Sequence, residues 1–187
     1  MVLSPRLDSQ AIQTKWAKKW EERDTYSFDH KSKKEVYSID SPPPFTSGAL
    51  HMGHVLSYSF FDFAARFHRM NGYNVFYPQG WDCQGFPTEV KVEKLHGKEL
   101  KLSREEFKAK CIEFTIENIA KMKSQMIRLG FSPDWKHEYK TIDPSYHKKV
   151  QLSVLQMYEK ELVYRKKHPV LYCVNCQSAI AKAETED

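Results

Sequence analysis

Residues 35–54 have the sequence EVYSIDSPPPFTSGALHMGH, and this stretch decides the fold. Its first six residues form a short β-branched and aromatic run that predicts a strand. Pro42, Pro43 and Pro44 exclude a helix next, because proline has a fixed φ and no backbone N–H. Gly48 then lets the backbone turn and approach another group closely. We therefore expect a strand followed by an extended loop that contains a glycine.

The residues after this stretch predict a helix and a second strand. Apolar side chains recur at spacings of four and three, which is typical of a helix: Leu56, Phe60, Phe63, Phe67 and Met70. Asn71-Gly72 is suited to end that helix, because both residues tolerate the left-handed conformation. Residues 73–78 then predict another strand. Together these elements make one right-handed βαβ unit, so we expect an α/β fold with a Rossmann-like parallel sheet.

His51 and His54 lie where the predicted helix begins. Unpaired N–H groups and the positive end of the helix dipole favour an anion there, usually a phosphate. Residues three apart point to the same side of a helical turn, so both imidazoles can donate to one phosphate chain. Gly53 between them leaves room for a flat base. The alternative is a pair of ordinary surface or core histidines, but the preceding strand, prolines and glycine argue against it.

A second loop, GWDCQGFPTE at residues 80–89, follows the strand predicted for residues 73–78. Such a loop lies at the carboxyl edge of a parallel sheet, where α/β folds bind ligands. Asp82 follows a tryptophan and lies between Gly80 and Gly85. A carboxylate beside an apolar ring suits an ammonium group, because it supplies both charge and direction. The alternative is a carboxylate that only stabilises the loop.

Two sequence signatures, in this order, resemble those of a known family. Residues 42–54, PPPFTSGALHMGH, resemble the HIGH signature of class I aminoacyl-tRNA synthetases. Residues 80–89 are similar to the second signature of the valyl, isoleucyl and leucyl subgroup. Their PTE ending and the FSPDW run at residues 131–135 are closest to archaeal-type valyl-tRNA synthetases. Isoleucyl enzymes, which usually have His where this chain has Gln84, are the nearest competitor. The resemblance extends from about Trp16 to Glu186.

This resemblance implies roles for the residues of both signatures. His51 and His54 would be the catalytic residues. Four residues would bind ATP: Gly48, His51, Gly53 and His54. Four would contact the amino acid: Pro43, Phe45, Trp81 and Asp82. Among these, Asp82 would hold the amino group of L-valine, and the others would line the same pocket.

The implied reaction needs ATP and Mg²⁺, and its other partners are L-valine and tRNA-Val. The sequence has no Lys-Met-Ser-Lys-Ser loop, editing domain or anticodon-binding domain, so we expect an N-terminal fragment that is inactive or weakly active alone. Three alternatives stay open: a fragment of an isoleucyl-tRNA synthetase, a nucleotidyltransferase with His-x-Gly-His at a helix start, and a non-catalytic truncated binding module.

Three further helices are predicted by caps and apolar spacing. The first runs from Asp8 to Glu22, with Asp8 as its cap. The second follows the capping box Ser103-Arg104-Glu105-Glu106 and ends at Gly130. We interpret it as structural, with Cys111 as a small core residue. The third opens at Asp143-Pro144 and extends to about Arg165.

The end of the chain has a different character. Residues 168–172 predict a short strand, and Cys173 and Cys176 follow at the spacing of half a zinc ribbon. Cys83 and Cys111 are poor candidates to complete the site. We therefore expect Cys173 and Cys176 to bind Zn²⁺ in a longer parent protein rather than in this fragment. Together with these patterns, the resemblance implies three parts: an N-terminal helix and lead-in (1–34), the first half of the Rossmann-like catalytic domain (35–165) and the start of a zinc-ribbon and editing-domain insertion (166–187).

The composition fits one folded domain. The 187 residues are 41% hydrophobic, which excludes a disordered chain. No apolar run reaches the roughly 20 residues of a membrane span, and the N-terminus lacks the apolar core of a signal peptide. We therefore expect a cytoplasmic protein without a membrane partner, and a monomer. The formal net charge of +5 is compatible with a polyanionic partner but decides nothing alone.

Overall fold

The computed structural model describes residues 8–96, 102–175, 177–182 and 185. They belong to two compact units, Met1–His147 and Lys148–Asp187. Each unit is described separately below. None of the helices in the part of the chain described here combines the length and apolar character needed to cross a membrane.

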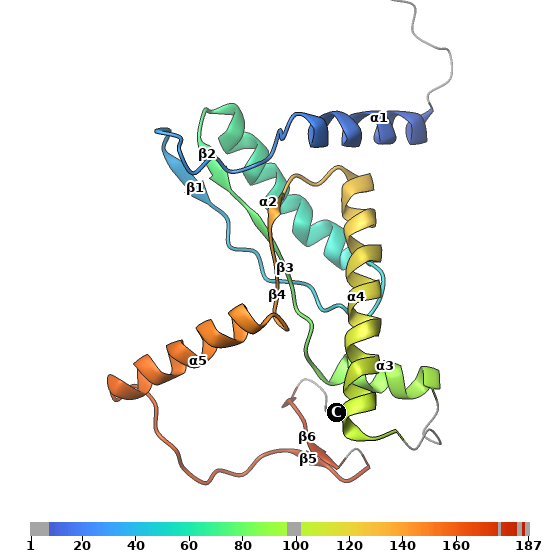
Figure 1. Cartoon of the computed structure of the whole chain (residues 1–187), viewed down its shortest axis with the longest axis vertical. Coiled ribbons are helices and arrows are strands. Elements are labelled where there is room, and N and C mark those ends of the chain that lie inside the picture. Colours follow the sequence, from blue (N-terminus) through green and yellow to red (C-terminus); the bar gives the residue numbers. More distant parts are fainter. Residues whose placement is uncertain (1–7, 97–101, 176, 183–184, 186–187) are drawn as a thin grey trace, which may run out of the picture. The chain divides into compact units, whose positions relative to one another are not determined.

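The βαβ unit predicted from residues 35–78 is present in the first unit. Strand β1 (Val36–Ser38) pairs in parallel with β2 (Asn74–Phe76), and Tyr37 lies opposite Val75. Helix α2 (Met52–Met70) connects them, and the two strands run side by side (Figure 1). The predicted helix and the parallel pairing are therefore confirmed.

The second predicted strand, residues 73–78, is not one strand. It is interrupted at Tyr77, and β3 (Pro78–Trp81) pairs in parallel with a different partner, β4 (Asp134–Lys140). The carbonyl of Tyr77 accepts a hydrogen bond from Asp134 N at 2.6 Å. Because Pro78 has no N–H, it cannot donate to a continuing ladder with β1. The result is two parallel pairs of strands, and β4 was not predicted.

Helix α2 packs through a face other than its most apolar one. The side chains of Tyr58, Asp62 and Ala65 are buried. The residues whose spacing predicted the helix are between 58% and 80% exposed: Leu56, Phe60, Phe63, Phe67 and Met70. The apolar spacing therefore predicted the helix correctly but not its buried face, because a paired carboxylate occupies that face.

The caps predicted for α1 and α4 are confirmed, whereas the Asp143 side chain before α5 (Pro144–Glu159) accepts from Lys140 N at 3.2 Å. Helix α1 (Ser9–Glu22) begins with Asp8 accepting from Ala11 N at 3.0 Å. Helix α4 (Arg104–Leu129) has the capping box of Ser103 and Glu106, and it ends at Gly130 with φ of 80°. Helix α3 (Phe86–His96) was not predicted.

The core of the first unit has two clusters. The larger one brings β3 and α4 together beneath α2: Tyr58, Trp81, Cys83, Ile119, Met122, Met126 and Phe131. The smaller one lies between β1, β2 and α2: Ile39, Ala65, Val75 and Tyr77. Cys111 is half-buried and belongs to neither cluster. Phe61 of α2 packs against both clusters, so α2 lies over both pairs of strands.

From Pro144 onward the chain is more irregular than predicted. Helix α5 (Pro144–Glu159) ends before the expected Arg165, and Glu161 has a positive φ of 57°. The strand predicted for residues 168–172 is only β5 (Tyr172–Cys173). It pairs antiparallel with β6 (Ser178–Ala179), with Cys173 opposite Ser178.

Asp62 anchors α2 to the turn between α4 and β4. Its Oδ1 accepts from the backbone N and the hydroxyl of Ser132, at 2.5 and 2.6 Å. Its Oδ2 accepts from Arg66 Nε at 2.6 Å. Arg66 also donates to the Tyr26 hydroxyl at 3.1 Å and to the Gly130 carbonyl. One buried carboxylate thus joins α2, the α4–β4 turn and the segment after α1.

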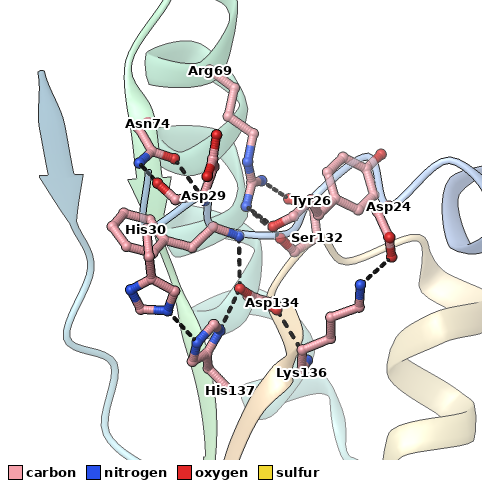
Figure 2. A network of polar contacts seen from close by, with 11 residues as sticks. Asp24, Tyr26, Asp29, His30, Arg69, Asn74, Ser132, Asp134, Lys136 and His137 are labelled. Atoms are coloured by element: carbon pink, nitrogen blue, oxygen red, sulfur yellow. Dashed lines mark hydrogen bonds and ion pairs between the residues drawn. The ribbon is translucent and has the colours of Figure 1, made fainter. Parts of the chain in front are cut away.

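A second carboxylate anchors the segment after α1 to β4 (Figure 2). Asp134, which is buried, accepts through Oδ2 from Phe28 N at 2.8 Å and contacts His137 Nδ1 at 2.7 Å. Figure 2 shows His137 between Asp134 and His30, whose Nε2 lies 2.9 Å from His137 Nε2. Residues 26–30 are therefore part of the first unit's structure.

We predict that Asp62→Asn lowers the free energy of unfolding by about 3 kcal/mol, because it leaves buried donors without their charged acceptor. Glu113→Gln is the matched control: its partner Lys110 is 3.0 Å away, but both side chains are exposed. The control should change stability by less than about 1 kcal/mol. Urea unfolding followed by circular dichroism at pH 7 measures both values, and equal midpoints would contradict the anchoring role of Asp62.

Candidate functional site

Backbone hydrogen bonds bring the two predicted signatures together. Phe45 and Asp82 form an isolated parallel bridge. Asp82 N donates to the Pro44 carbonyl at 2.9 Å, and Thr46 N donates to the Asp82 carbonyl at 3.0 Å. The Thr46 hydroxyl also donates to the Asp82 carbonyl at 3.2 Å. The proline-rich loop therefore continues the sheet beside the end of β3, so residues far apart in the sequence share one edge.

His51 and His54 lie against each other at the start of α2. Their ring centroids are 3.8 Å apart and their planes are tilted by 31°. His51 has an extended backbone as the cap of α2, and its side chain is exposed. His54 is partly exposed one turn later. The two imidazoles thus point the same way, at a helix start that attracts anions.

A backbone contact defines the tautomer of His54. His54 Nδ1 accepts from His51 N at 3.3 Å, so Nδ1 carries no proton and the neutral ring has its hydrogen on Nε2. Burial lowers the pKa of His54 below its ordinary value of 6.5, and the neighbouring His51 lowers it further. Near neutral pH, His54 is therefore a neutral imidazole that can donate from Nε2.

The two glycines of the predicted ATP site lie close to side chains. A Cβ at Gly53 would come within 3.0 Å of the His51 ring, so any larger residue would press on that imidazole. A Cβ at Gly48 would lie 3.1 Å from Lys91 Nζ, which donates to the Ser47 carbonyl. Gly53 therefore leaves space for His51 itself, in addition to the space that we predicted for a base.

The four residues predicted to contact the amino acid differ in exposure. Phe45 is 54% exposed, and Pro43 and Asp82 are half-buried. Trp81 has no exposed area and belongs to the larger core cluster. Its side chain therefore packs inside the protein, and its contact with an amino acid stays a prediction.

Several residues around this edge were not predicted. The Thr141 hydroxyl accepts from Cys83 N at 2.9 Å and lies 3.5 Å from Asp82 Oδ1. Tyr58 donates to the Pro42 carbonyl at 2.6 Å, and Gln125 Oε1 accepts from Leu50 N at 2.9 Å. None of these residues belongs to a recognisable motif. The sequence placed Tyr58 and Gln125 inside predicted helices, but nothing in it indicated that their side chains contact this loop.

The predicted zinc ligands are only partly described. Cys173 is half-buried at the end of β5, whereas Cys176 lies outside the described residues. Within the described ranges, no group of three or more His, Cys, Asp or Glu side chains could hold a metal ion. A tetrahedral site needs four ligands, so this part of the chain does not by itself supply one.

Residues 15–187 match the family described as tRNA synthetases class I (I, L, M and V). The chain is 53% identical, over 175 residues, to a valine–tRNA ligase of Methanothermobacter thermautotrophicus; the match covers 93% of this chain and 20% of the relative. It is 50% identical, over 180 residues, to a valine–tRNA ligase of Archaeoglobus fulgidus, which covers 96% of this chain and 21% of the relative. The chain therefore spans about a fifth of the length of these relatives.

A solved structure with the same fold is also similar. It is a crystal structure of the ternary complex of Agrobacterium radiobacter K84 agnB2 LeuRS with tRNA and LeuAMS, with a TM-score of 0.79 and 32% sequence identity. The similarity covers 95% of this chain and 21% of that chain. The predicted α/β catalytic-domain fold is therefore confirmed at the level of its helices and parallel strands.

We predict that His54 is the Nε2–H tautomer and titrates at a lower pH in the folded chain than in the chain unfolded in urea. Between these two midpoints the unfolded state binds more protons, so stability should rise with pH in that range. It should level off above the midpoint of the unfolded chain. Two-dimensional ¹⁵N NMR of the imidazoles, assigned with a His54→Asn variant, measures the tautomer and the titration midpoint of His54. A proton on Nδ1 would contradict the contact with His51 N, and a midpoint at or above that of the unfolded chain would contradict the effects of burial and of His51 on the pKa of His54.

Proposed function

Because this chain belongs to the class I tRNA synthetases of the I, L, M and V group, we propose that it forms the first part of the catalytic domain of a valine–tRNA ligase. The observation that carries the proposal is the sequence identity of 53% and 50% to archaeal valine–tRNA ligases, over 93% and 96% of this chain. The whole enzyme would activate L-valine with ATP and transfer it to tRNA-Val.

The proposed chemistry uses the two signatures on one sheet edge. The carboxylate of valine would attack the α-phosphorus of ATP in line, and pyrophosphate would leave. No covalent nucleophile on the protein is needed, because positioning and charge stabilisation carry such a reaction. His54 would donate from Nε2 to the developing charge on the phosphates, and His51 would donate beside it. Mg²⁺ on the triphosphate would neutralise part of that charge.

The amino-acid side of the proposed site rests on Asp82. Its half-buried carboxylate would hold the ammonium group of valine, and its backbone is bonded to the proline-rich loop at Pro44 and Thr46. Pro43 and Phe45 on that loop would line the side-chain pocket. A shift of the loop would therefore move the pocket and the ammonium site together.

Two further features belong to the same proposal. Cys173 and Cys176 would provide half of a zinc site, because Cys173 stands where the β5–β6 hairpin turns and structural zinc sites take paired cysteines at this spacing. A cytoplasmic location, where such thiols stay reduced, would suit both the cysteines and a tRNA partner.

We expect the full-length protein that carries this chain to catalyse ATP–pyrophosphate exchange with valine, and far more weakly with isoleucine and leucine. One extra methylene in an apolar pocket is worth only about 1–3 kcal/mol, so the binding step alone would discriminate by roughly 10- to 200-fold. Exchange assays at matched concentrations of the three amino acids test this. A preference for isoleucine would replace the proposed specificity with the isoleucyl alternative.

We also predict that two substitutions in the full-length enzyme change different kinetic constants. His54→Ala should lower kcat of adenylate formation by about 100-fold with a small change in KM for valine, because it removes a donor to the transition state. Asp82→Ala should mainly raise KM for valine, because the ammonium group loses its charged partner. Pyrophosphate exchange at varied valine and ATP measures both, and similar effects of the two variants would show that the roles are wrong.

A further inference from the structure

We propose that Gln125 of α4 is a positioning residue for the adenylation site, acting through the backbone of Leu50 on the placement of His51 and His54. The sequence predicted α4 to be a structural helix, and no motif includes Gln125. The inference rests on the proposed function, because it assigns a kinetic role to a contact with the HIGH-like loop.

The contact is at the last residue before the helix cap. Gln125 Oε1 accepts from Leu50 N at 2.9 Å, and the next amide, His51 N, donates to His54 Nδ1 at 3.3 Å. Two consecutive N–H groups are thus held, the first by a side chain from α4 and the second by the functional histidine. Because His54 uses Nδ1 here, the direction of its Nε2–H depends on where His51 N lies. Gln125 therefore influences the placement of both histidine side chains through the peptide unit that joins Leu50 to His51.

Gln125 itself lies on a rigid support. It is half-buried, and its neighbour on α4, Met126, has no exposed area and packs in the larger core cluster. Helix α4 is tied to α2 at its C-terminal end, where Arg66 donates to the Gly130 carbonyl. The acceptor oxygen is therefore fixed relative to α2, as a group that sets the geometry of a reacting site must be.

The other end of the same loop has its own anchor. The Tyr58 hydroxyl donates to the Pro42 carbonyl at 2.6 Å, next to Pro43 of the proposed amino-acid pocket. Tyr58 is 4% exposed, and burial raises the pKa of its hydroxyl. The loop is thus held at Pro42 by α2 and at Leu50 by α4. This geometry separates the two anchors: Tyr58 supports the valine side, and Gln125 supports the histidine side.

The test compares four variants of the full-length enzyme in ATP–pyrophosphate exchange, with kcat normalised by titration of active sites. Gln125→Leu removes the acceptor at similar volume, whereas Gln125→Glu keeps an acceptor oxygen. Ser124→Ala is the matched control, because it changes the exposed neighbouring residue of the same helix. Tyr58→Phe removes only the hydroxyl at the other anchor.

We expect Gln125→Leu to lower kcat at least tenfold, in line with the loss that follows when a reacting group is misplaced by about 1 Å, and to leave KM for valine within about twofold. Gln125→Glu should recover most of kcat, and Ser124→Ala should match the parent enzyme. Tyr58→Phe should raise KM for valine with a smaller effect on kcat. Together these results would separate the two ends of the loop.

Three outcomes overturn the inference. The first is a normalised kcat for Gln125→Leu equal to that of the parent, and the second is an equal loss in Gln125→Leu and Gln125→Glu. The third is a change confined to thermal stability and to the active fraction, which would assign Gln125 a merely structural role. A parent enzyme that gives no exchange with valine, isoleucine or leucine would instead refute the proposed function and with it the kinetic role of Gln125. The experiment therefore distinguishes the two failures.

Discussion

A buried carboxylate on α2 constrains the rest of this structure. Asp62 can be 5% exposed only because Arg66 and both donors of Ser132 surround its oxygens. An ionised group left unpaired there would destabilise the fold strongly. Helix α2 must therefore lie against the α4–β4 turn with this face inward. That orientation places the N-terminus of α2, with its two histidines, at the edge where the loop and the end of β3 meet.

The candidate site is assembled mostly through the backbone. The pairing of Phe45 with Asp82 is a short extension of a sheet, and the loop before His51 is held by side chains from helices below it. Such contacts restrict the loop without occupying the surface that a ligand would use. The exposed His51, the partly exposed His54 and the half-buried Asp82 carboxylate remain available. Trp81 and Tyr58 behind them belong to the core.

Elements with strong local signals were predicted well. The capping box at Ser103, the glycine at Gly130 and the cap at Asp8 act within a few residues, so their geometry is encoded locally. Strand β4 was not predicted because its sequence, DWKHEYK, has no apolar run and is mostly charged, although its ring-bearing side chains alternate with charged ones. The break at Tyr77 was not predicted because it depends on the neighbouring strands: β2 pairs with β1, whereas β3 pairs with β4.

By itself, the sequence determined the βαβ order, the caps at Asp8, Ser103 and Gly130 and the two signatures that should form the site. These depend on the conformational limits of proline and glycine, on hydrogen bonds within one turn and on residue type. Only the tertiary structure decided which face of α2 is buried, that β3 pairs with β4, and that Gln125 reaches the amide before His51. Each of these is a contact between segments distant in sequence. Apolar spacing measures the hydrophobicity of a face, whereas burial depends on the partner that the face meets. Here the buried face of α2 carries the paired carboxylate of Asp62, and the row of phenylalanines is exposed.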